Sequence, residues 1–444
     1  MNRAAQGYWQ GALPWGAVSL IEATIAVNRF GLGAAPGELE RVAVDPRGWL
    51  SAQLAPSPAP DALARRPDTG ALMRAAARQK GKDHARKLAR ALYMDEASDA
   101  LKVAVASERG FHERLVAFWS NHVAVSVKRA KVLGLAGAYE REAVRPRVTG
   151  RYQELLIAAM KHPAMLLYLD NNRSVGPDSP VGQRQEKGLN ENLARELLEL
   201  HTLGVDGGYT QSDVESLAAI LTGWGLSEEK DGFLFSERRH QPGRKLLLGR
   251  RYGEGLEEGE RALAELARHP STARHLSRKL ASHFSSDAPP PALVAALEEA
   301  WMDTWGDLGA VYAALLAHPD AWTPDAAKIK SPRDLVISTA RAVGDRSFPL
   351  YTSVEKLGQQ PWAPDSPQGF PDTAAAWLGP AAVLQRVEWA AFMAARSRRV
   401  EPAQVGGDAL GASLTARTRR WISASATREE GLALLLASPE FQRR

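Results

Sequence analysis

The segment 190–204 is the most regular helical pattern in the chain. At about 100° per residue, its apolar residues gather on one arc of a helical wheel and its charged residues on the other. Asn190 can cap the start, Glu191 stands in the first turn where the helix dipole favours an anion, and Gly204 is the usual C′ glycine. Similar patterns recur along the sequence, which therefore predicts an all-α, predominantly helical protein.

Two predicted helices each place a histidine where an apolar residue is expected. His201 falls in the apolar arc of 190–204, and His122 falls in the apolar arc of the segment 108–128. A buried imidazole is desolvated and needs hydrogen-bond partners. Each histidine is either a satisfied core residue or a group that points into a pocket between helices. Two histidines on separate core faces raise the odds that they meet.

The composition narrows the class of protein further. Hydrophobic residues make up 45% and charged residues 24% of the 444 residues, as in an ordinary globular protein. The net charge of +5 is only mildly basic for this length, so we expect no nucleic-acid partner. The chain has no cysteine, which excludes disulfides, thiolate catalysis and cysteine-ligated metal sites. No run of about 18 apolar residues occurs, so no membrane span is expected.

Residues 1–27 are interpreted as an N-terminal extension, and residues 28–444 as one large helical domain. The extension lacks a compact apolar core and has only Arg3 before its uncharged run, which makes it a poor signal peptide. Two segments with prolines and glycines, 170–188 and 358–372, predict long loop insertions. The aromatic residues of the second loop either cover a pocket or bury the loop against the core.

The segment 233–252 predicts the one short β-hairpin of the chain, with an apolar run at each end. Between these runs lies a basic turn that contains His240, Arg244 and Lys245. Such a turn is either an anion-binding site or an exposed, charged hairpin tip. It lacks the glycine and lysine pattern of a phosphate-binding loop, which excludes that class of site.

Several motifs, in chain order, resemble those of one bacterial family, the domain of unknown function 1800 family. The resemblance covers most of the chain, and its long motif at 190–204 is specific. The matching motifs are NRFG at 28–31, PGEL at 36–39, FWSNH at 118–122, the whole of 190–204, YTQSDV at 209–214, LTGW at 221–224, the segment 240–249, Ser-Pro at 331–332, and the segment 358–377.

The resemblance implies no settled activity. Members of the family resemble exported proteins in many cases, and they are often encoded beside a second uncharacterised family that resembles sulfatases and phosphatases. The resemblance therefore implies that the sulfatase- or phosphatase-like protein encoded nearby is a partner. It also implies the cell envelope or periplasm as the compartment. The poor signal peptide leaves the cytoplasm as the alternative. This chain departs from the family pattern twice, because Gln241 replaces an acid next to His240 and Phe370 replaces a tryptophan.

Two functions from different classes fit these patterns. The first is an enzyme with a pocket between helices that acts on an anionic substrate. Its expected catalytic residues are His122, His201 and His240. Its expected substrate-binding residues are Asn121, Asn190, Glu191, Arg195, Arg244 and Lys245. His122 and His201 could hold a divalent transition metal together with a carboxylate, or the same imidazoles could perform acid–base chemistry.

The second function is a non-catalytic helical scaffold or partner-binding protein, in which both histidines are packed and satisfied. The acid lost at Gln241 favours the scaffold, whereas polar groups that converge on apolar faces favour the enzyme. The sequence contains no HExxH motif, no Ser–His–acid arrangement and no GxGxxG fingerprint. It therefore offers no argument for a zincin, a serine hydrolase or a dinucleotide-binding enzyme.

Overall fold

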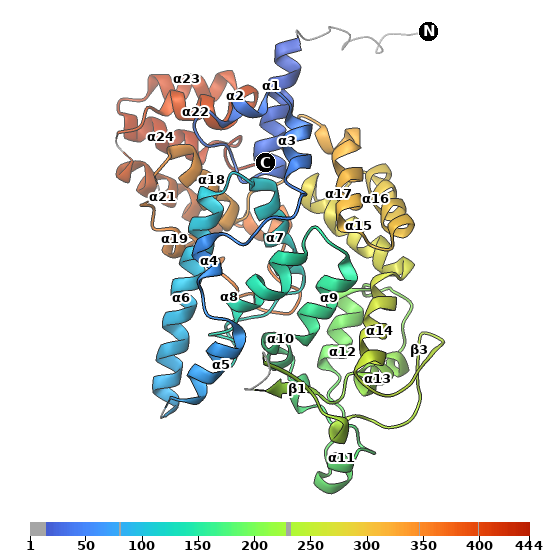
Figure 1. Ribbon diagram of the computed structural model, residues 1–444. Helices are drawn as coiled ribbons and strands as arrows, with labels where there is room; N and C mark the ends of the chain where they lie inside the picture. The colour runs from blue at the N-terminus through green and yellow to red at the C-terminus, as the bar shows by residue number, and fades with distance from the viewer. Residues whose placement is uncertain (1–14, 80, 228–231, 346, 398) are drawn as a thin grey trace, which may run out of the picture.

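The computed structural model describes residues 15–79, 81–227, 232–345, 347–397 and 399–444. Helices dominate this part of the chain, and its strands form two small antiparallel sheets (Figure 1). The prediction of a predominantly helical protein is therefore confirmed. Within the same residues, no helix combines the length and the apolar character that crossing a bilayer requires.

The described N-terminal half is predominantly helical. Its helices are α1 (Trp15–Ile25), α2 (Glu38–Val42), α3 (Pro46–Ala52), α4 (Asp61–Ala64), α5 (Thr69–Ala77), α6 (Lys82–Ala106), α7 (Gly110–His122), α8 (Ala136–Tyr139), α9 (Tyr152–Lys161), α10 (Pro163–Tyr168), α11 (Pro180–Gln185), α12 (Asn192–Glu196) and α13 (Gln211–Ile220). The long α6 lies along one side of the molecule, and α7 runs through its interior (Figure 1).

The C-terminal half is again helical. Its helices are α14 (Leu256–Ala267), α15 (Pro270–Phe284), α16 (Pro291–Thr304), α17 (Leu308–Ala317), α18 (Pro332–Val343), α19 (Leu350–Lys356), α20 (Ala374–Trp377), α21 (Pro380–Arg396), α22 (Pro402–Leu410), α23 (Ala416–Ala424) and α24 (Arg428–Ala437). Proline opens several of them, where its fixed φ suits the first turn and its missing N–H has no partner to lose. Figure 1 shows α21 to α24 gathered beside α1 and α2.

The described β-structure consists of two hairpins, and the predicted pairing of the apolar runs at the two ends of 233–252 is wrong, because each run pairs with a neighbouring segment instead. β1 (Trp224–Ser227) pairs with β2 (Gly232–Phe235), and β3 (Lys245–Leu247) pairs with β4 (Arg250–Tyr252). The two residues between β3 and β4, Leu248 and Gly249, have φ values of 49° and 74°. Positive φ at both positions is the geometry of a tight two-residue hairpin turn, so the second apolar run folds back on the residues that follow it.

The segment 190–204 is less regular than its sequence predicts. The α-helical part is α12, and the chain then continues as a π-helical turn, Leu197–His201. Gly204, with φ of 87°, ends the segment and donates its N–H to the carbonyl of Leu198. A π-helical turn holds one more residue than an α-helical turn and is frequent at functional sites. It changes the direction in which His201 projects.

The buried apolar residues form two clusters that α6 connects. The larger cluster includes Tyr93 and Ala97 of α6 and the cores of α7, α9 and α15. The smaller cluster includes Leu101 and Ala104 of α6 and the cores of α18, α19, α21 and α24. Helix α6 therefore belongs to both apolar cores and α7 to the larger one, and the cavity described below lies along these two helices.

Candidate active site

Helix α7 carries His122 at its last residue. The apolar face predicted from the sequence is buried, and it includes Phe111, Leu115 and Trp119. His122 is only 2% exposed, so it lies inside this packed face. The carbonyl of the next residue, Val123, accepts a hydrogen bond of 2.6 Å from the Tyr139 hydroxyl. The end of α7 is thereby fixed at the point where the imidazole emerges.

The fold brings His122 and His201 together. Their ring centroids are 5.7 Å apart, and the rings are nearly perpendicular. The Nδ1 of His201 donates to the carbonyl oxygen of His122 at 2.9 Å, which satisfies a carbonyl at the C-terminal end of α7. In return, the carbonyl oxygen of His201 lies 3.3 Å from Nε2 of His122 and accepts from the Tyr152 hydroxyl. His201 therefore holds the end of α7 and the ring of His122.

Lys279 of α15 is the other direct partner of His122. Its Nζ lies 3.0 Å from Nδ1 of His122. An ammonium group can only donate, so Nδ1 is the acceptor and Nε2 carries the imidazole proton. That proton points at the Tyr152 hydroxyl, 3.2 Å away, and at the carbonyl of His201. The lysine thus fixes the tautomer of His122.

Burial shifts the titration of this group of side chains. Burial lowers the pKa of Lys279 to about 8, and the charge of Asp372 opposes this only in part. Burial, followed by the charge of Lys279, also holds the pKa of His122 well below its usual range and lowers the pKa of His201 to about 3. At neutral pH both imidazoles are therefore neutral, and Lys279 is a cation near its titration point.

The face of α15 that carries Lys279 holds two further histidines. His275, Lys279 and His283 are four residues apart, so they project in one row along the helix. The Nε2 of His275 lies 3.3 Å from the carbonyl of Leu200, and Nδ1 of His283 lies 2.8 Å from Oδ2 of Asp372. The four-residue spacing of this row is visible in the sequence, but by itself it predicts no cavity.

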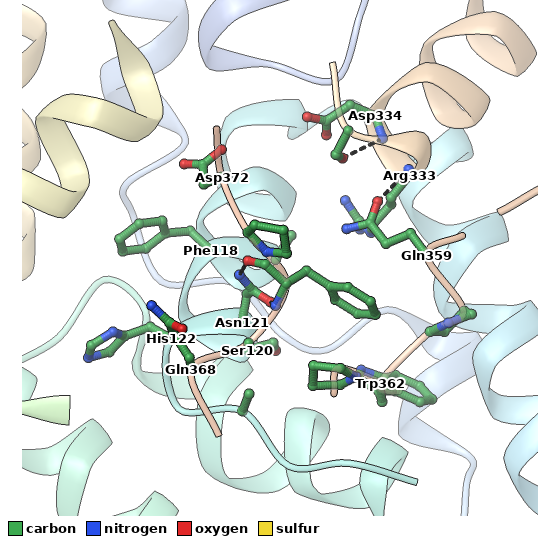
Figure 2. A pocket seen from close by; sticks show the side chains of 18 of the residues that line it. Phe118, Ser120, Asn121, His122, Arg333, Asp334, Gln359, Trp362, Gln368 and Asp372 are labelled. Atoms are coloured by element: carbon green, nitrogen blue, oxygen red, sulfur yellow. Dashed lines mark hydrogen bonds between the residues drawn. The ribbon is translucent and has the colours of Figure 1, made fainter. Parts of the chain in front are cut away.

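A cavity of about 540 Å³ opens beside His122. Its walls come from α6, α7 and α15, from the start of α18, and from residues 359–373. Figure 2 shows Asn121 of α7 between Trp362 and Gln368 of this last segment. The volume lies in the range typical of small-molecule sites. The prolines and glycines of 358–372 therefore do form a loop with aromatic side chains at a pocket.

Asn121 fastens the loop over the cavity. Its side-chain amide donates to the carbonyl of Phe370 at 2.8 Å, and its side-chain oxygen accepts from the N–H of Phe370 at 2.7 Å (Figure 2). Gly369 has φ of 84°, and a Cβ atom there would lie 2.2 Å from the carbonyl oxygen of Asn121. Only glycine fits this approach without a shift. Asn121, predicted as a substrate-binding residue, thus lines the cavity but uses its amide on the loop.

The acidic side chains at the cavity are matched by cations. Asp334 lies 3.2 Å from Arg114 and 3.3 Å from Arg444. Asp372 lies against His283 and also within 3.5 Å of the Nζ of Lys328. These cations lower the pKa of both carboxyl groups, so the two acids are charged at neutral pH.

Two cations at the cavity have no such match. Lys279 and Arg333 both line it, and neither makes an ion pair with a carboxylate in the described part of the chain. One terminal nitrogen of Arg333 is buried without any hydrogen-bond partner there. Figure 2 shows the guanidinium beside Gln359, whose side-chain oxygen accepts from the backbone N–H of Arg333. A buried donor without a partner is a place for a ligand acceptor.

The residues predicted on the basic turn lie outside this cavity. The Nδ1 of His240 donates to the carbonyl of Thr222 at 2.9 Å, and its Nε2 lies 3.2 Å from the Nζ of Lys245. Lys245 also donates to backbone carbonyls of Gln241 and Gly253. Arg244 is exposed. His240 and Lys245 form a small, internally bonded group of their own, and none of the three lines the cavity.

The polar start of the segment 190–204 also stays away from the cavity lining. The side-chain oxygen of Asn190 accepts from the N–H of Asn192 at 3.0 Å, so it acts at the helix start as predicted. Glu191 and Arg195 form the predicted pair, with 2.6 Å between their charged groups. Both side chains are partly exposed, and Gln211 bonds to both. Their predicted contact with substrate stays a prediction.

The predicted metal role of His122 and His201 also stays a prediction. Over the described ranges, no group of three or more His, Cys, Asp or Glu residues is placed to hold a metal ion. Both ring nitrogens of His122 already have hydrogen-bond partners. The Nε2 of His201 is buried and has no partner among the described residues. This arrangement suits proton transfer by His122 more directly than metal ligation.

Fold and site together define a helical protein with a cavity between its helices, lined by a neutral histidine, a lysine of lowered pKa and an unpaired arginine. The chain belongs to the family described as protein of unknown function (DUF1800), whose model matches residues 25–443. The resemblance seen in the sequence is thereby confirmed. Comparisons with curated proteins and with solved structures gave no match.

Proposed function

We propose that the protein is an enzyme that binds a small anionic substrate in the cavity and transfers a proton through His122 and Lys279. The observation that carries this proposal is the position of Lys279, which faces a cavity and bonds to a neutral imidazole at 3.0 Å. Partly buried cations are normally paired with carboxylates. A lysine and an arginine left unpaired in one cavity favour an anion as the missing partner.

The two titratable groups suit acid–base chemistry near neutral pH. A proton donor works best when its pKa lies close to the working pH, and burial lowers the pKa of Lys279 to about 8. His122 accepts from Lys279 through Nδ1, so the ring nitrogen that can take up a proton faces the lysine, while Nε2 keeps its proton on buried partners. Arg333 would hold the anionic group of the substrate through its fork of N–H donors.

His201 and Tyr152 act in this proposal as positioning residues. Neither lines the cavity, and each contacts His122 from the side away from Lys279. The hydroxyl of Tyr152 donates to the carbonyl of His201 and lies near Nε2 of His122. They support one tautomer and one orientation of the imidazole, as the partners of a catalytic histidine usually do.

A second candidate function, partner binding, is favoured by an apolar surface elsewhere. On α21, Val383, Leu384 and Val387 are 42%, 59% and 49% exposed, although they follow one helical row. Exposed apolar rows of this kind often mark protein contacts. This surface is separate from the cavity lining, so the two functions can be tested independently.

Turnover of a defined mixture of small carboxylates and phosphate esters tests the enzyme proposal. The wild-type protein should deplete at least one compound, measured by mass spectrometry. His122→Gln and Lys279→Met should slow that reaction by at least about 100-fold, the usual contribution of a proton-transfer group. Arg244→Met, a change of an exposed arginine in the connection between the two hairpins, should leave the rate unchanged. Equal rates in all four proteins, or no depletion at all, would favour the partner-binding role.

A further inference from the structure

We infer that Arg333 and Gln359 hold the carboxylate of an apolar monocarboxylic acid, whose hydrocarbon chain lies along the cavity. This inference rests on the proposed anion-binding function and deepens it by naming the class of the anion. Both side chains line the cavity, and Figure 2 shows them next to each other on the side opposite His122. The carboxylate site is therefore separate from the contact between Lys279 and His122.

Arg333 and Gln359 offer hydrogen-bond donors that the described residues leave unused. The side-chain oxygen of Gln359 accepts from the backbone N–H of Arg333 at 2.8 Å, which fixes the orientation of the amide. The side-chain NH2 of Gln359 has no partner among the described residues, and neither has the guanidinium of Arg333, of which one terminal nitrogen is buried. A guanidinium and an amide that lie side by side can donate to the two oxygens of a carboxylate.

The charges around the start of α18 also favour an anionic ligand. Asp334 follows Arg333 in the chain, but Arg114 and Arg444 already pair with its carboxylate at 3.2 and 3.3 Å. Lys330 lies close enough to interact with the same carboxylate. The N-terminal end of a helix adds partial positive charge of its own. The cations of this region thus outnumber its carboxylates, and a bound anion would offset the surplus.

Glu140 also lines the cavity but does not compete for Arg333. Its Oε2 accepts from the hydroxyl of Ser120 and from the indole N–H of Trp362, both at 2.9 Å. Its Oε1 lies 3.8 Å from a terminal nitrogen of Arg145. The carboxylate of Glu140 is therefore satisfied by its own neighbours, and it holds the indole ring in the cavity wall.

Apolar side chains form the wall beside Arg333 and Gln359. Helices α18 and α19 both pack against α6. The apolar side chains of α6 and α19 that line the cavity are Ala97, Ala100, Leu101 and Val354. The backbone N–H of Gln359 donates to the carbonyl of Val354 at 2.8 Å, so the polar donors adjoin the apolar wall. A hydrocarbon chain buried against this wall gains about fourfold in affinity for each methylene group that leaves water.

The size of the cavity favours a chain over a short acid. Its volume of about 540 Å³ suits a molecule much larger than acetate. A short acid at Arg333 would leave the rest of the apolar wall in contact with water. A chain that extends towards His122 would cover this wall, and it would bring the far end of the molecule to the groups that transfer the proton.

Titration calorimetry of the full-length protein with octanoate, butanoate and octanamide tests the inference. Octanoate has the carboxylate and the chain, butanoate has a shorter chain, and octanamide has the same chain without the charge. We expect octanoate to bind at least about tenfold more tightly than butanoate, because more methylene groups are buried. Octanamide should bind at least about tenfold more weakly than octanoate. These comparisons use the wild-type protein, so they do not depend on how a variant folds.

Two pairs of variants locate the site. Arg333→Met should bind octanoate as weakly as octanamide, whereas the exposed Arg244→Met should bind octanoate like the wild type. Ala100→Phe places a ring in the apolar wall, so it should weaken octanoate at least about tenfold and leave butanoate unchanged. Ala91→Phe, at an exposed position of α6, is the matched control and should bind both acids like the wild type.

The outcomes separate this inference from the proposed function. Butanoate that binds as tightly as octanoate, with binding lost in Arg333→Met, would refute the apolar chain and leave the anion site standing. Octanoate binding that survives Arg333→Met would refute the assigned residues alone. Equal binding of octanoate and octanamide would refute a charged site, and with it the anionic substrate of the proposed function. If no acid binds, both proposals are refuted for carboxylates of this size.

Discussion

At the scale of single residues, the candidate site depends on one contact, between Lys279 and His122. Their nitrogens are 3.0 Å apart, although the residues are 157 positions apart in the chain. The contact sets the tautomer of the imidazole and leaves the ammonium facing the cavity. The contact also places the charged ammonium of Lys279 in a buried position, where a charge is unfavourable. Lys279 should therefore lower the free energy of unfolding of the protein.

Lys279→Met should therefore stabilise the protein at neutral pH. Burial lowers the folded pKa of Lys279 to about 8, below the unfolded value of about 10.4. At neutral pH the lysine is charged in both states, and the burial cost is fully present. Between about pH 8 and about pH 10 the unfolded state binds more protons, so wild-type stability rises with pH. We expect a gain of about 1–3 kcal/mol for the variant at neutral pH, which shrinks towards pH 10.

Chemical denaturation at several pH values measures this difference. The histidines that face the same ammonium do not disturb the comparison, because burial keeps the pKa of His275 near 4 and that of His122 well below its usual range. Asp372 stays charged throughout, because His283 and Lys328 hold its pKa low. A variant that is less stable than the wild type at neutral pH would show that the lysine is a stabilising core residue.

His201→Leu tests the positioning role assigned to His201. The change removes the N–H that donates to the carbonyl of His122 and leaves that carbonyl buried without this partner. We expect a loss of about 1–3 kcal/mol in the free energy of unfolding, with the activity lost as well. His201→Gln retains a donor and should recover part of both. Full stability in His201→Leu would contradict the assignment.

At the scale of elements, α7 and the loop 358–372 are joined through one side chain. Asn121 makes two hydrogen bonds to the backbone of Phe370, and the indole N–H of Trp362 donates to Glu140 at 2.9 Å. These bonds connect a loop without helices or strands to helices of the larger apolar core. The cavity thus has one wall that polar contacts hold in place, and Asn121 makes those at Phe370.

Asn121→Ala should release this wall. Removal of both hydrogen bonds should expose the backbone around Phe370 to proteases without unfolding α7, because the loss of about 1–2 kcal/mol is local and other bonds still hold the ends of the loop. Limited proteolysis with peptide mapping measures the rate of cleavage in the loop. Gln368→Ala, on the same loop, is the matched control, and its cleavage should match the wild type. Equal cleavage of both variants would mean that Asn121 does not hold the loop.

The sequence predicted the elements better than their details. The apolar periodicity of 108–128 was read correctly and the start of the helix at Asn190 only to within two residues, because α12 begins at Asn192, whose N–H donates to the side chain of Asn190. The π-helical turn before Thr202 and the tight turn at Leu248 were not predicted, because neither has a clear periodic signal. Because that tight turn was missed, the two apolar runs of 233–252 were wrongly expected to pair with each other.

The sequence also revealed only part of the site. Two histidines on apolar faces pointed to His122 and His201, which do come together. Lys279 and Arg333 carry the chemistry of the cavity but look like ordinary surface residues of amphipathic helices. What distinguishes them is the absence of an acidic partner in three dimensions, and spacing along a chain does not contain that information.

At the scale of the whole molecule, a buried group of charges connects distant parts of the chain. Asp334, at the start of α18, pairs with Arg114 of α7 and with Arg444. Arg114 also donates to the carbonyl of Gly31 at 2.6 Å, and Arg444 donates to the carbonyl of His283 at 2.9 Å. The group therefore connects α7 of the larger apolar cluster with α18 of the smaller one, and its members Arg114 and Asp334 line the cavity.

Asp334→Asn should destabilise the whole molecule. It leaves two buried guanidinium groups without their carboxylate, at a cost of about 3–5 kcal/mol at neutral pH. Since the arginines lower the folded pKa of Asp334, its contribution is complete above the unfolded pKa of about 3.9 and is lost as the pH falls below that value. Thermal unfolding measures both effects. Asp365→Asn, which breaks an exposed pair with Lys128, should change stability by less than about 1 kcal/mol.

The central claim is that the unpaired cations of the cavity bind an anion, and titration calorimetry with small mono- and dicarboxylates tests it most directly. The account predicts that at least one carboxylate binds the wild-type protein and Arg244→Met equally. The same compound should bind at least about tenfold more weakly to Arg333→Met and Lys279→Met, the loss expected for a charge-assisted hydrogen bond. Binding that is lost in Arg244→Met and retained in Arg333→Met, or no binding of any carboxylate, would contradict the claim.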